Sequence, residues 1–171
     1  TVDVGFWRRH ALVSGIVAIN LLVWVVQLVQ GGSWLEPSVQ SLFEGGGSLS
    51  VYSLTDEPWR LFTSLFVHAG LMHLAMNLLL LLQVAPLVTA RFGAVGLFCI
   101  YFLGGLLATT TSAAWGAVSV VRALSDDGMA FIRSLQLVVS VGASGAIMAV
   151  CGGLLASEIR SDRSQDPKAR E

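Results

Sequence analysis

The feature that most constrains this chain is the stretch from Leu61 to Ala90, thirty residues without Asp, Glu, Lys or Arg. A helix rises about 1.5 Å per residue, so roughly 20 apolar residues cross a bilayer core of about 30 Å. Three further stretches are comparably apolar. The pattern predicts an all-α, polytopic membrane protein with four transmembrane helices, at about residues 11–30, 66–90, 93–114 and 142–158.

Composition favours the same class. The chain is 54% hydrophobic and 12% charged, whereas soluble domains carry about 25% charged residues. A net charge of -1 provides no basic face for nucleic acid, so no nucleic-acid partner is expected. Cys99 and Cys151 both lie in apolar stretches, and we expect them to be reduced packing residues. The expected partner is therefore the lipid bilayer, and the expected location is the cell membrane.

Basic residues predict the orientation, because cytoplasmic loops of membrane proteins are rich in Lys and Arg. They precede the first span, join the second to the third, and follow the fourth; these are Arg8, Arg9, Arg91, Arg160, Arg163, Lys168 and Arg170. The loop from Gly31 to Trp59, on the opposite side, has four acidic residues and no Lys or Arg: Glu36, Glu44, Asp56 and Glu57. We therefore expect cytoplasmic residues 1–10, a membrane domain over 11–160 with an added outer element at 115–141, and a polar, disordered cytoplasmic tail at 161–171.

Three polar side chains interrupt the second apolar stretch, in the sequence HAGLMHLAMN: His68, His73 and Asn77. His73 and Asn77 are four residues apart and would share one face of a helix. His68 would lie about 140° around the helix from His73, which does not suit chelation, so no metal is expected. Two interpretations remain open: hydrogen bonds that join neighbouring helices, or a functional site, the usual hypothesis for ionisable residues inside a membrane.

Ser144 lies among small residues in VGASGAIMAV, with Gly142 before it and Gly145 after it. Such residues are typical of close helix packing. The alternative interpretation is a nucleophile at the start of a helix. Gly142 would then permit a tight turn, and free backbone N–H groups could stabilise an oxyanion.

Depth in the membrane favours the second interpretation. Ser144 lies fourteen residues before Glu158, about 21 Å along a helix. His73 lies eighteen residues before Arg91, about 27 Å along a helix. The serine, the histidine and Asn77 would therefore meet near one level, below the outer face of the membrane.

The sequence WRLFTSLFVHAGLMHLAMN, from Trp59, followed by GASG resembles the rhomboid intramembrane serine proteases. The match comprises Trp59-Arg60, the polar residues at spacings of five and four, and the glycine-flanked serine; YFLGG, from Tyr101, is also similar. It covers about residues 10–160. The resemblance implies a rhomboid-like six-helix core, of which this chain would contribute four helices.

The resemblance also implies roles for the matched positions. Ser144 would be the nucleophile that attacks the scissile carbonyl, after a turn at Gly142. His73 and Asn77, with the backbone N–H of Ser144, would form the oxyanion hole. The remaining matched residues would give structural support: His68, Trp59, Arg60 and Gly145. The implied enzyme is a serine endopeptidase that needs no metal or cofactor. It would cleave single-span membrane proteins in or near their transmembrane segment.

The chain departs from the family pattern in one respect that concerns catalysis. The family's general-base histidine comes from the sixth span, whereas His10, His68 and His73 all precede Ser144. We therefore expect no general base in this chain and no activity from its 171 residues alone. The alternative function is a catalytically inactive rhomboid-like protein that binds transmembrane clients. The retained serine and its flanking glycines favour the protease.

Overall fold

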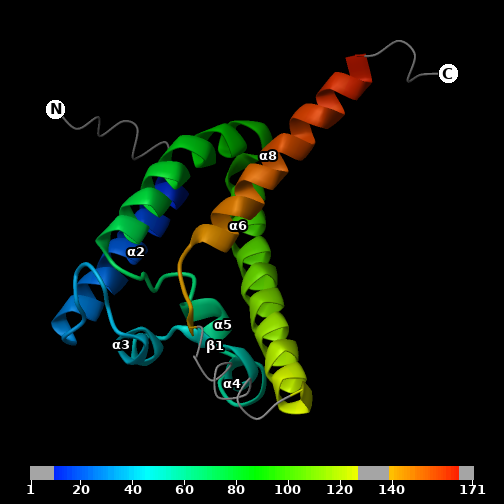
Figure 1. The fold of residues 1–171 in the computed structure, drawn as a ribbon. Coiled ribbons are helices and arrows are strands. Elements are labelled where there is room, and N and C mark those ends of the chain that lie inside the picture. Colours follow the sequence, from blue (N-terminus) through cyan, green and yellow to red (C-terminus); the bar gives the residue numbers. More distant parts are fainter. Residues whose placement is uncertain (1–9, 127–138, 166–171) are drawn as a thin grey trace.

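The computed structural model describes residues 10–126 and 139–165, and Figure 1 shows their arrangement. The elements are α2 (Ala11–Val29), α3 (Val39–Glu44), β1 (Ser48–Leu49), α4 (Ser50–Thr55), α5 (Arg60–Thr63), α6 (Leu71–Asp126), β2 (Val139–Ser140) and α8 (Ser144–Gln165). Long helices α2, α6 and α8 form the body of the molecule, and the short elements between α2 and α6 gather at one end of it. The structure confirms a mainly helical fold.

Helix α6 is two helices joined by a bend. It runs over 56 residues, and Gly93 within it has φ 74° and ψ 175°, which is not helical. Glycine adopts such positive φ values readily because it has no Cβ. Figure 1 shows the first helix rising to the bend and the second returning across α8. The second helix, residues 94–126, is about 50 Å long at 1.5 Å per residue.

Two helical stretches among the described residues are long and apolar enough to cross a membrane, Ala11–Val29 and Leu71–Arg122. The second includes the bend. The expected start of a span at residue 66 is wrong, because α6 begins at Leu71. Gly70 before it has φ +102°, and a side chain there would collide with the Leu35 carbonyl oxygen. The chain is therefore held in a turn until residue 71.

The expected ends of two helices are also wrong. α6 continues past residue 114 to Asp126, so the first half of the expected outer element is helical; residues 127–138 lie outside the described part. α8 continues to Gln165, so residues 161–165 are helical rather than disordered. Extending an existing helix fixes one residue for each new hydrogen bond, so a packed helix continues easily into polar sequence. Residues 166–171 of the expected tail are not described.

The core is built by all the long helical segments. Its buried side chains come from α2, both parts of α6, and the start of α8: Val13, Ile16, Val17, Leu81, Ala85, Val88, Leu97, Tyr101, Ala143, Ala146, Ile147 and Val150. Small residues bring α8 against the second part of α6. A methyl group on Gly104 would lie 2.3 Å from Ala149 Cβ, and one on Gly145 would lie 2.7 Å from Ala108 Cβ. Helices in membranes commonly pack closely in this way.

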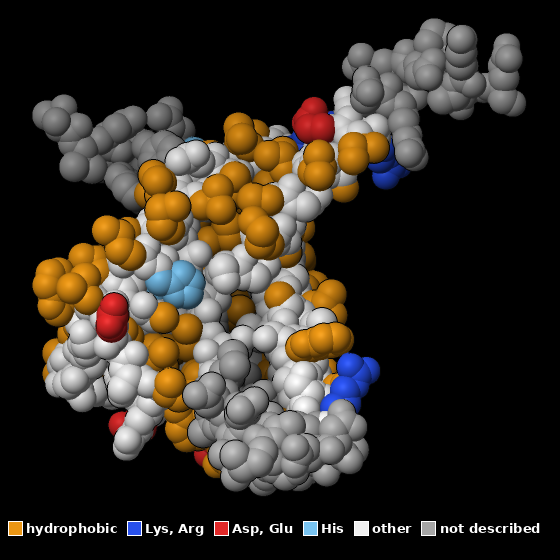
Figure 2. Space-filling view, viewed as in Figure 1, with side chains coloured by type: hydrophobic (Ala, Val, Ile, Leu, Met, Phe, Trp, Pro, Cys, Tyr) orange, Lys and Arg blue, Asp and Glu red, His pale blue; other side chains and the backbone are white. Residues whose placement is uncertain are grey.

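Hydrophobic side chains also cover much of the outside, as Figure 2 shows. Along the second part of α6, Val95, Leu103 and Leu107 are 77%, 65% and 68% exposed. This is the exterior expected where the solvent is lipid rather than water. Cys99 lies among these exposed residues and Cys151 is half-buried; both are free. Because the Cys99 side chain is exposed, the expectation that it is a packing residue is wrong.

Candidate active site

The segment that leads into Ser144 is fixed by backbone hydrogen bonds. β2 pairs antiparallel with β1, with Ser140 opposite Ser48. Two residues later the N–H of Gly142 donates to the Ser64 carbonyl at 2.8 Å. Gly142 has φ +102°, so the expected turn is present, and α8 begins at Ser144. The Ser144 side chain is exposed at this helix start.

His73 and Asn77 both lie against that turn. A Cβ on Gly142 would be 2.5 Å from His73 Cε1, 2.8 Å from His73 Nε2 and 3.3 Å from Asn77 Nδ2. The two side chains lie where a side chain on residue 142 would be, so only glycine fits at that position. The prediction that they share a helix face is confirmed, because both meet one residue of another element.

Helix α6, which carries His73 and Asn77, and helix α8, which begins at Ser144, are joined again near Arg91 and Glu158. Arg91 Nη1 lies 3.6 Å from Glu158 Oε1, and Arg91 Nη2 donates to the Ser157 carbonyl at 3.0 Å. Asn77 lies fourteen residues before Arg91, and Ser144 lies fourteen before Glu158. Along their helices, Asn77 is therefore about 21 Å from Arg91, and Ser144 is about 21 Å from Glu158. The ion pair and the contact at Gly142 set one level for Asn77 and Ser144.

A backbone hydrogen bond fixes which nitrogen of His73 carries the proton. The Ala69 N–H donates to His73 Nδ1 at 3.3 Å. A ring nitrogen that accepts a hydrogen bond is unprotonated, so the neutral ring carries its proton on Nε2. Nε2 is the nitrogen that faces Gly142. His73 therefore presents a donor toward the turn before Ser144.

Other donors point into the same space. Asn77 is buried, and its Nδ2 has no hydrogen-bond partner among the described residues. The first N–H groups of a helix lack carbonyl partners within the helix; the N–H of Ile147 is the first to bond back, to the Ala143 carbonyl at 2.9 Å. These donors therefore lie beside the turn at Gly142, two residues before Ser144. Such an arrangement can stabilise negative charge that develops on a carbonyl oxygen attacked there.

His68 does not lie where a helix would place it. It precedes α6 in a turn, and its ring centroid is 5.3 Å from that of His73, so the expected separation onto another face is wrong. His68 Nδ1 lies 3.0 Å from the Phe66 carbonyl. Its backbone forms a reciprocal pair with the Gln27 side chain: the His68 N–H donates to Oε1 at 3.1 Å, and Nε2 donates to the His68 carbonyl at 3.2 Å. His68 thus joins α2 to the turn behind His73.

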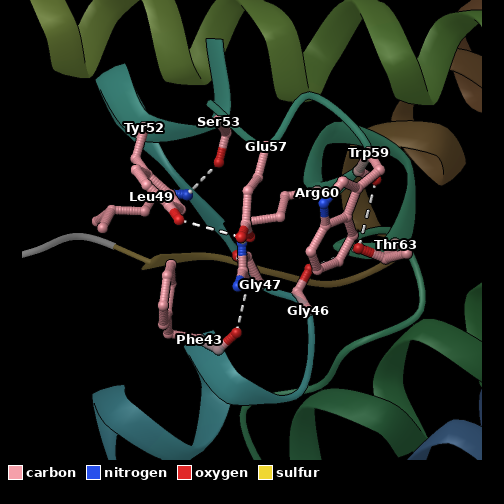
Figure 3. A network of polar contacts seen from close by, with 10 residues as sticks. All are labelled: Phe43, Gly46, Gly47, Leu49, Tyr52, Ser53, Glu57, Trp59, Arg60 and Thr63. Carbon is pink, nitrogen blue, oxygen red and sulfur yellow. Dashed lines mark hydrogen bonds and ion pairs between the residues drawn. The ribbon is translucent and has the colours of Figure 1, made fainter. Parts of the chain in front are cut away.

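Arg60 organises the loop elements, as Figure 3 shows. Its side chain is nearly fully buried, at 6% exposed. Nε pairs with Glu57 Oε2 at 2.5 Å, and Nη1 donates to the carbonyls of Phe43 and Gly47. The guanidinium carbon also lies 4.5 Å from the Trp59 ring centroid. One arginine therefore connects α3, β1 and α5, and β1 in turn pairs with the strand before Ser144.

The same loop contains a second polar contact to Glu57. The Tyr52 hydroxyl donates to Glu57 Oε1 at 3.0 Å, and this hydrogen bond raises the pKa of Tyr52 above its ordinary value of 10.0. Glu57 is thus held by both Tyr52 and Arg60. The two bonds keep the carboxylate oriented toward the buried guanidinium.

Sequence reasoning missed two residues that position the site. Ser64 supplies the carbonyl that holds Gly142, and Gln27 supplies the amide that holds His68. Gln27 gave a usable signal, since it is a polar residue inside an apolar stretch. Ser64 gave none, because its contribution is a backbone oxygen that every residue carries.

Comparison with known proteins identifies a family. The family model described as Rhomboid domain matches residues 55–169. The rhomboid protease AarA of Providencia stuartii is 30% identical over 140 residues, 82% of this chain and 48% of AarA. The rhomboid protease GluP of Bacillus subtilis is 28% identical over 139 residues, 81% of this chain and 23% of GluP. No solved structure matches the chain at a significant level.

A relative of a different kind also matches. The inactive RHOMBOID-like protein 8 of Arabidopsis thaliana is 41% identical over 75 residues, 43% of this chain and 21% of that protein. The helical fold and the apolar exterior define an integral membrane protein that carries polar side chains at the start of one helix. The chain belongs to the rhomboid family, which includes both proteases and inactive members. It spans about half or less of the length of these relatives.

Proposed function

We propose that this chain carries the nucleophile and the oxyanion hole of a rhomboid-type intramembrane serine endopeptidase. Its substrates would be single-span membrane proteins, cut in or near the transmembrane segment. Ser144 attacks the scissile carbonyl carbon, and the negative charge that forms on the carbonyl oxygen is stabilised by His73, Asn77 and the backbone N–H of Ser144. No step requires a metal or a cofactor.

The observation that carries the proposal is the contact of two side-chain donors with Gly142. His73 Nε2 lies 2.8 Å, and Asn77 Nδ2 3.3 Å, from where a Gly142 Cβ would be. Hydrogen bonds between helices would satisfy both side chains, but Asn77 Nδ2 has no such bond within the described part. A buried donor left unpaired beside the turn before an exposed serine is better explained by charge that appears during a reaction.

Ser144 needs a base to accept its proton, because a serine hydroxyl alone is a weak nucleophile. The chain has three histidines. His73 Nε2 is the proposed oxyanion donor. His68 Nδ1 is bound to the Phe66 carbonyl, and its other nitrogen, Nε2, is buried and forms no hydrogen bond to Ser144 or to any other described residue. His10 precedes α2, at the end of that helix far from the loop elements in Figure 1. We therefore assign the base to a residue outside residues 1–171.

The second candidate function is an inactive rhomboid-like protein that binds transmembrane clients. The similarity to a relative named inactive favours it. The intact turn at Gly142 and the exposed Ser144 favour the protease. The two differ in one measurable property, covalent reactivity of the serine.

The test uses the protein expressed from its complete reading frame and reconstituted in lipid vesicles. We expect a fluorophosphonate probe to label wild type, and Ser144→Ala to abolish both labelling and cleavage of a single-span substrate. Ser119→Ala is the matched control, because among the described residues its hydroxyl bonds only to the Trp115 carbonyl, at 2.9 Å, on the outer part of α6; this variant should behave as wild type. Absence of labelling in folded wild type would support the client-binding alternative instead.

The proposal includes four membrane crossings, made by α2, the two parts of α6, and α8. Both termini would then lie in the cytoplasm, with α3, α4 and α5 outside the cell. In Figure 1 the start of α2 and the end of α8 lie toward the same end of the molecule as the α6 bend. In intact cells a cysteine replacing Glu36 should react with an impermeant maleimide, and one replacing Gln165 should not. The reverse pattern would refute this orientation.

A further inference from the structure

A hollow lies at the end of the long helices opposite the loop elements. It encloses about 490 Å³ between the bend of α6 and α8, and its lining includes Arg91, Phe92, Gly153, Ser157 and Arg160. That volume is within the range of small-molecule sites, about 300–1,000 Å³. None of these residues belongs to the site around Ser144.

The hollow is rich in positive charge that the protein only partly neutralises. Arg91 has one carboxylate near it, Glu158 at 3.6 Å, and both side chains are well exposed, at 40% and 61%. Exposed pairs of this kind are weak. Arg160 is exposed and forms no ion pair with any residue in the described ranges. Figure 2 shows Lys and Arg side chains around this part of α8, beside hydrophobic ones.

A second hollow adjoins the first and has a different character. It encloses about 470 Å³ and shares Arg91 and Glu158 with an apolar wall formed by Leu87, Ala90 and Leu154. Leu87 lies one helical turn before Arg91, and Leu154 lies six residues before Arg160. These leucines are therefore about 6–9 Å deeper in the membrane than the arginines.

We propose that the paired hollows bind one anionic phospholipid. Arg91 and Arg160 contact its phosphate at the membrane boundary, and one acyl chain lies along Leu87 and Leu154. Basic pockets between transmembrane helices are suited to such headgroups. The apolar hollow points to a lipid rather than a free phosphate, because a soluble phosphate has no group to place there. Bound in this way, the lipid would bridge the α6 bend and α8 independently of any proteolytic activity.

The test measures which lipid the complete protein retains. The protein is purified in mixed micelles that contain equal amounts of phosphatidylglycerol and phosphatidylcholine, and native mass spectrometry counts the bound lipids. We expect wild type to prefer phosphatidylglycerol. Each of Arg91→Gln and Arg160→Gln should lower that preference about fivefold, as expected for one basic side chain near a membrane surface. Arg122→Gln, an exposed arginine near the other end of α6, is the matched control and should change nothing.

Three results would overturn the proposal. Wild type could show no preference for phosphatidylglycerol. Alternatively, Arg122→Gln could lower that preference as much as Arg160→Gln does, which would indicate general attraction to the basic surface. Glycerol 3-phosphate added in excess could also displace the lipid, which would make a soluble phosphate the ligand. Thermal unfolding is followed for every variant, since Arg91 also bonds to the Ser157 carbonyl. Arg160 makes no such bond in the described part, so its variant tests the proposal without disturbing packing.

Discussion

Replacing Gly142 by alanine tests the proposed oxyanion hole directly. The added methyl carbon would lie 2.5 Å from His73 Cε1, whereas non-bonded carbons are comfortable at about 3.5–4.0 Å. His73 or the turn must therefore move by about 1 Å. Misplacing a catalytic group by that distance lowers the rate about a hundredfold, and loss of one oxyanion donor lowers it about a hundredfold to a thousandfold.

The same substitution should also destabilise the fold. Gly142 has φ +102°, and a non-glycine residue held in a sparsely populated backbone region costs about 1–3 kcal/mol. Gly152 provides the matched control, because a methyl group there meets nothing within 4 Å and the residue lies within α8. Gly152→Ala should keep full activity and gain about 0.5–1 kcal/mol of stability, as alanine usually does in a helix.

The assay is cleavage of a single-span substrate by the complete protein in lipid vesicles, with kcat and KM determined separately. Because oxyanion donors act on the transition state, Gly142→Ala should lower kcat with little change in KM. Thermal unfolding of the same vesicles shows that the remaining protein is folded. A folded Gly142→Ala variant with wild-type kcat would refute the assignment of His73 to the oxyanion.

Three further predictions follow from the same structure. Asn77→Ala should lower kcat about a hundredfold to a thousandfold while leaving KM nearly unchanged; a change in KM alone, in the same kinetic assay, would mean that Asn77 contacts substrate without stabilising the transition state. Arg60→Ala should lower the free energy of unfolding by about 3–5 kcal/mol, because it leaves Glu57 Oε2 and two carbonyls without the guanidinium; a loss below 1 kcal/mol in denaturant titration would contradict the bracing role. The isolated 171-residue chain should not react with a fluorophosphonate, since no histidine is placed as a base for Ser144; labelling would show that a base is present, with His73 the candidate.

Local rules account for the parts of the fold and site that the sequence predicted. Apolar stretches bounded by arginines set the long helices, because a helix must be of a certain length to cross a membrane. The four-residue spacing of His73 and Asn77 predicted a shared face, because a helix turns every 3.6 residues. A glycine two residues before Ser144 predicted a turn. Each of these inferences depends only on residues close together in the chain.

Long-range contacts account for what the sequence could not predict. Helix α6 continues to Asp126 and packs against α4 at Gly116. A methyl group on Gly116 would lie 2.2 Å from Ser50 Oγ. Nothing in the sequence near Gly116 predicts this contact. The nearness of His68 to His73 arises from the turn at Gly70. That turn is closed by a hydrogen bond from the Leu71 N–H to the Trp34 carbonyl, at 2.8 Å, from a distant loop.

The sequence by itself determined that the chain is a helical membrane protein and which side chains could take part in chemistry. Only the tertiary structure decided that His73 and Asn77 meet the turn at Gly142, because the contact joins elements about 65 residues apart along the chain. It also decided which nitrogen of His73 faces that turn, through the Ala69 N–H. Hydrogen-bond partners of this kind depend on three-dimensional packing. A backbone group such as the Ser64 carbonyl cannot be predicted from residue type, because every residue has one.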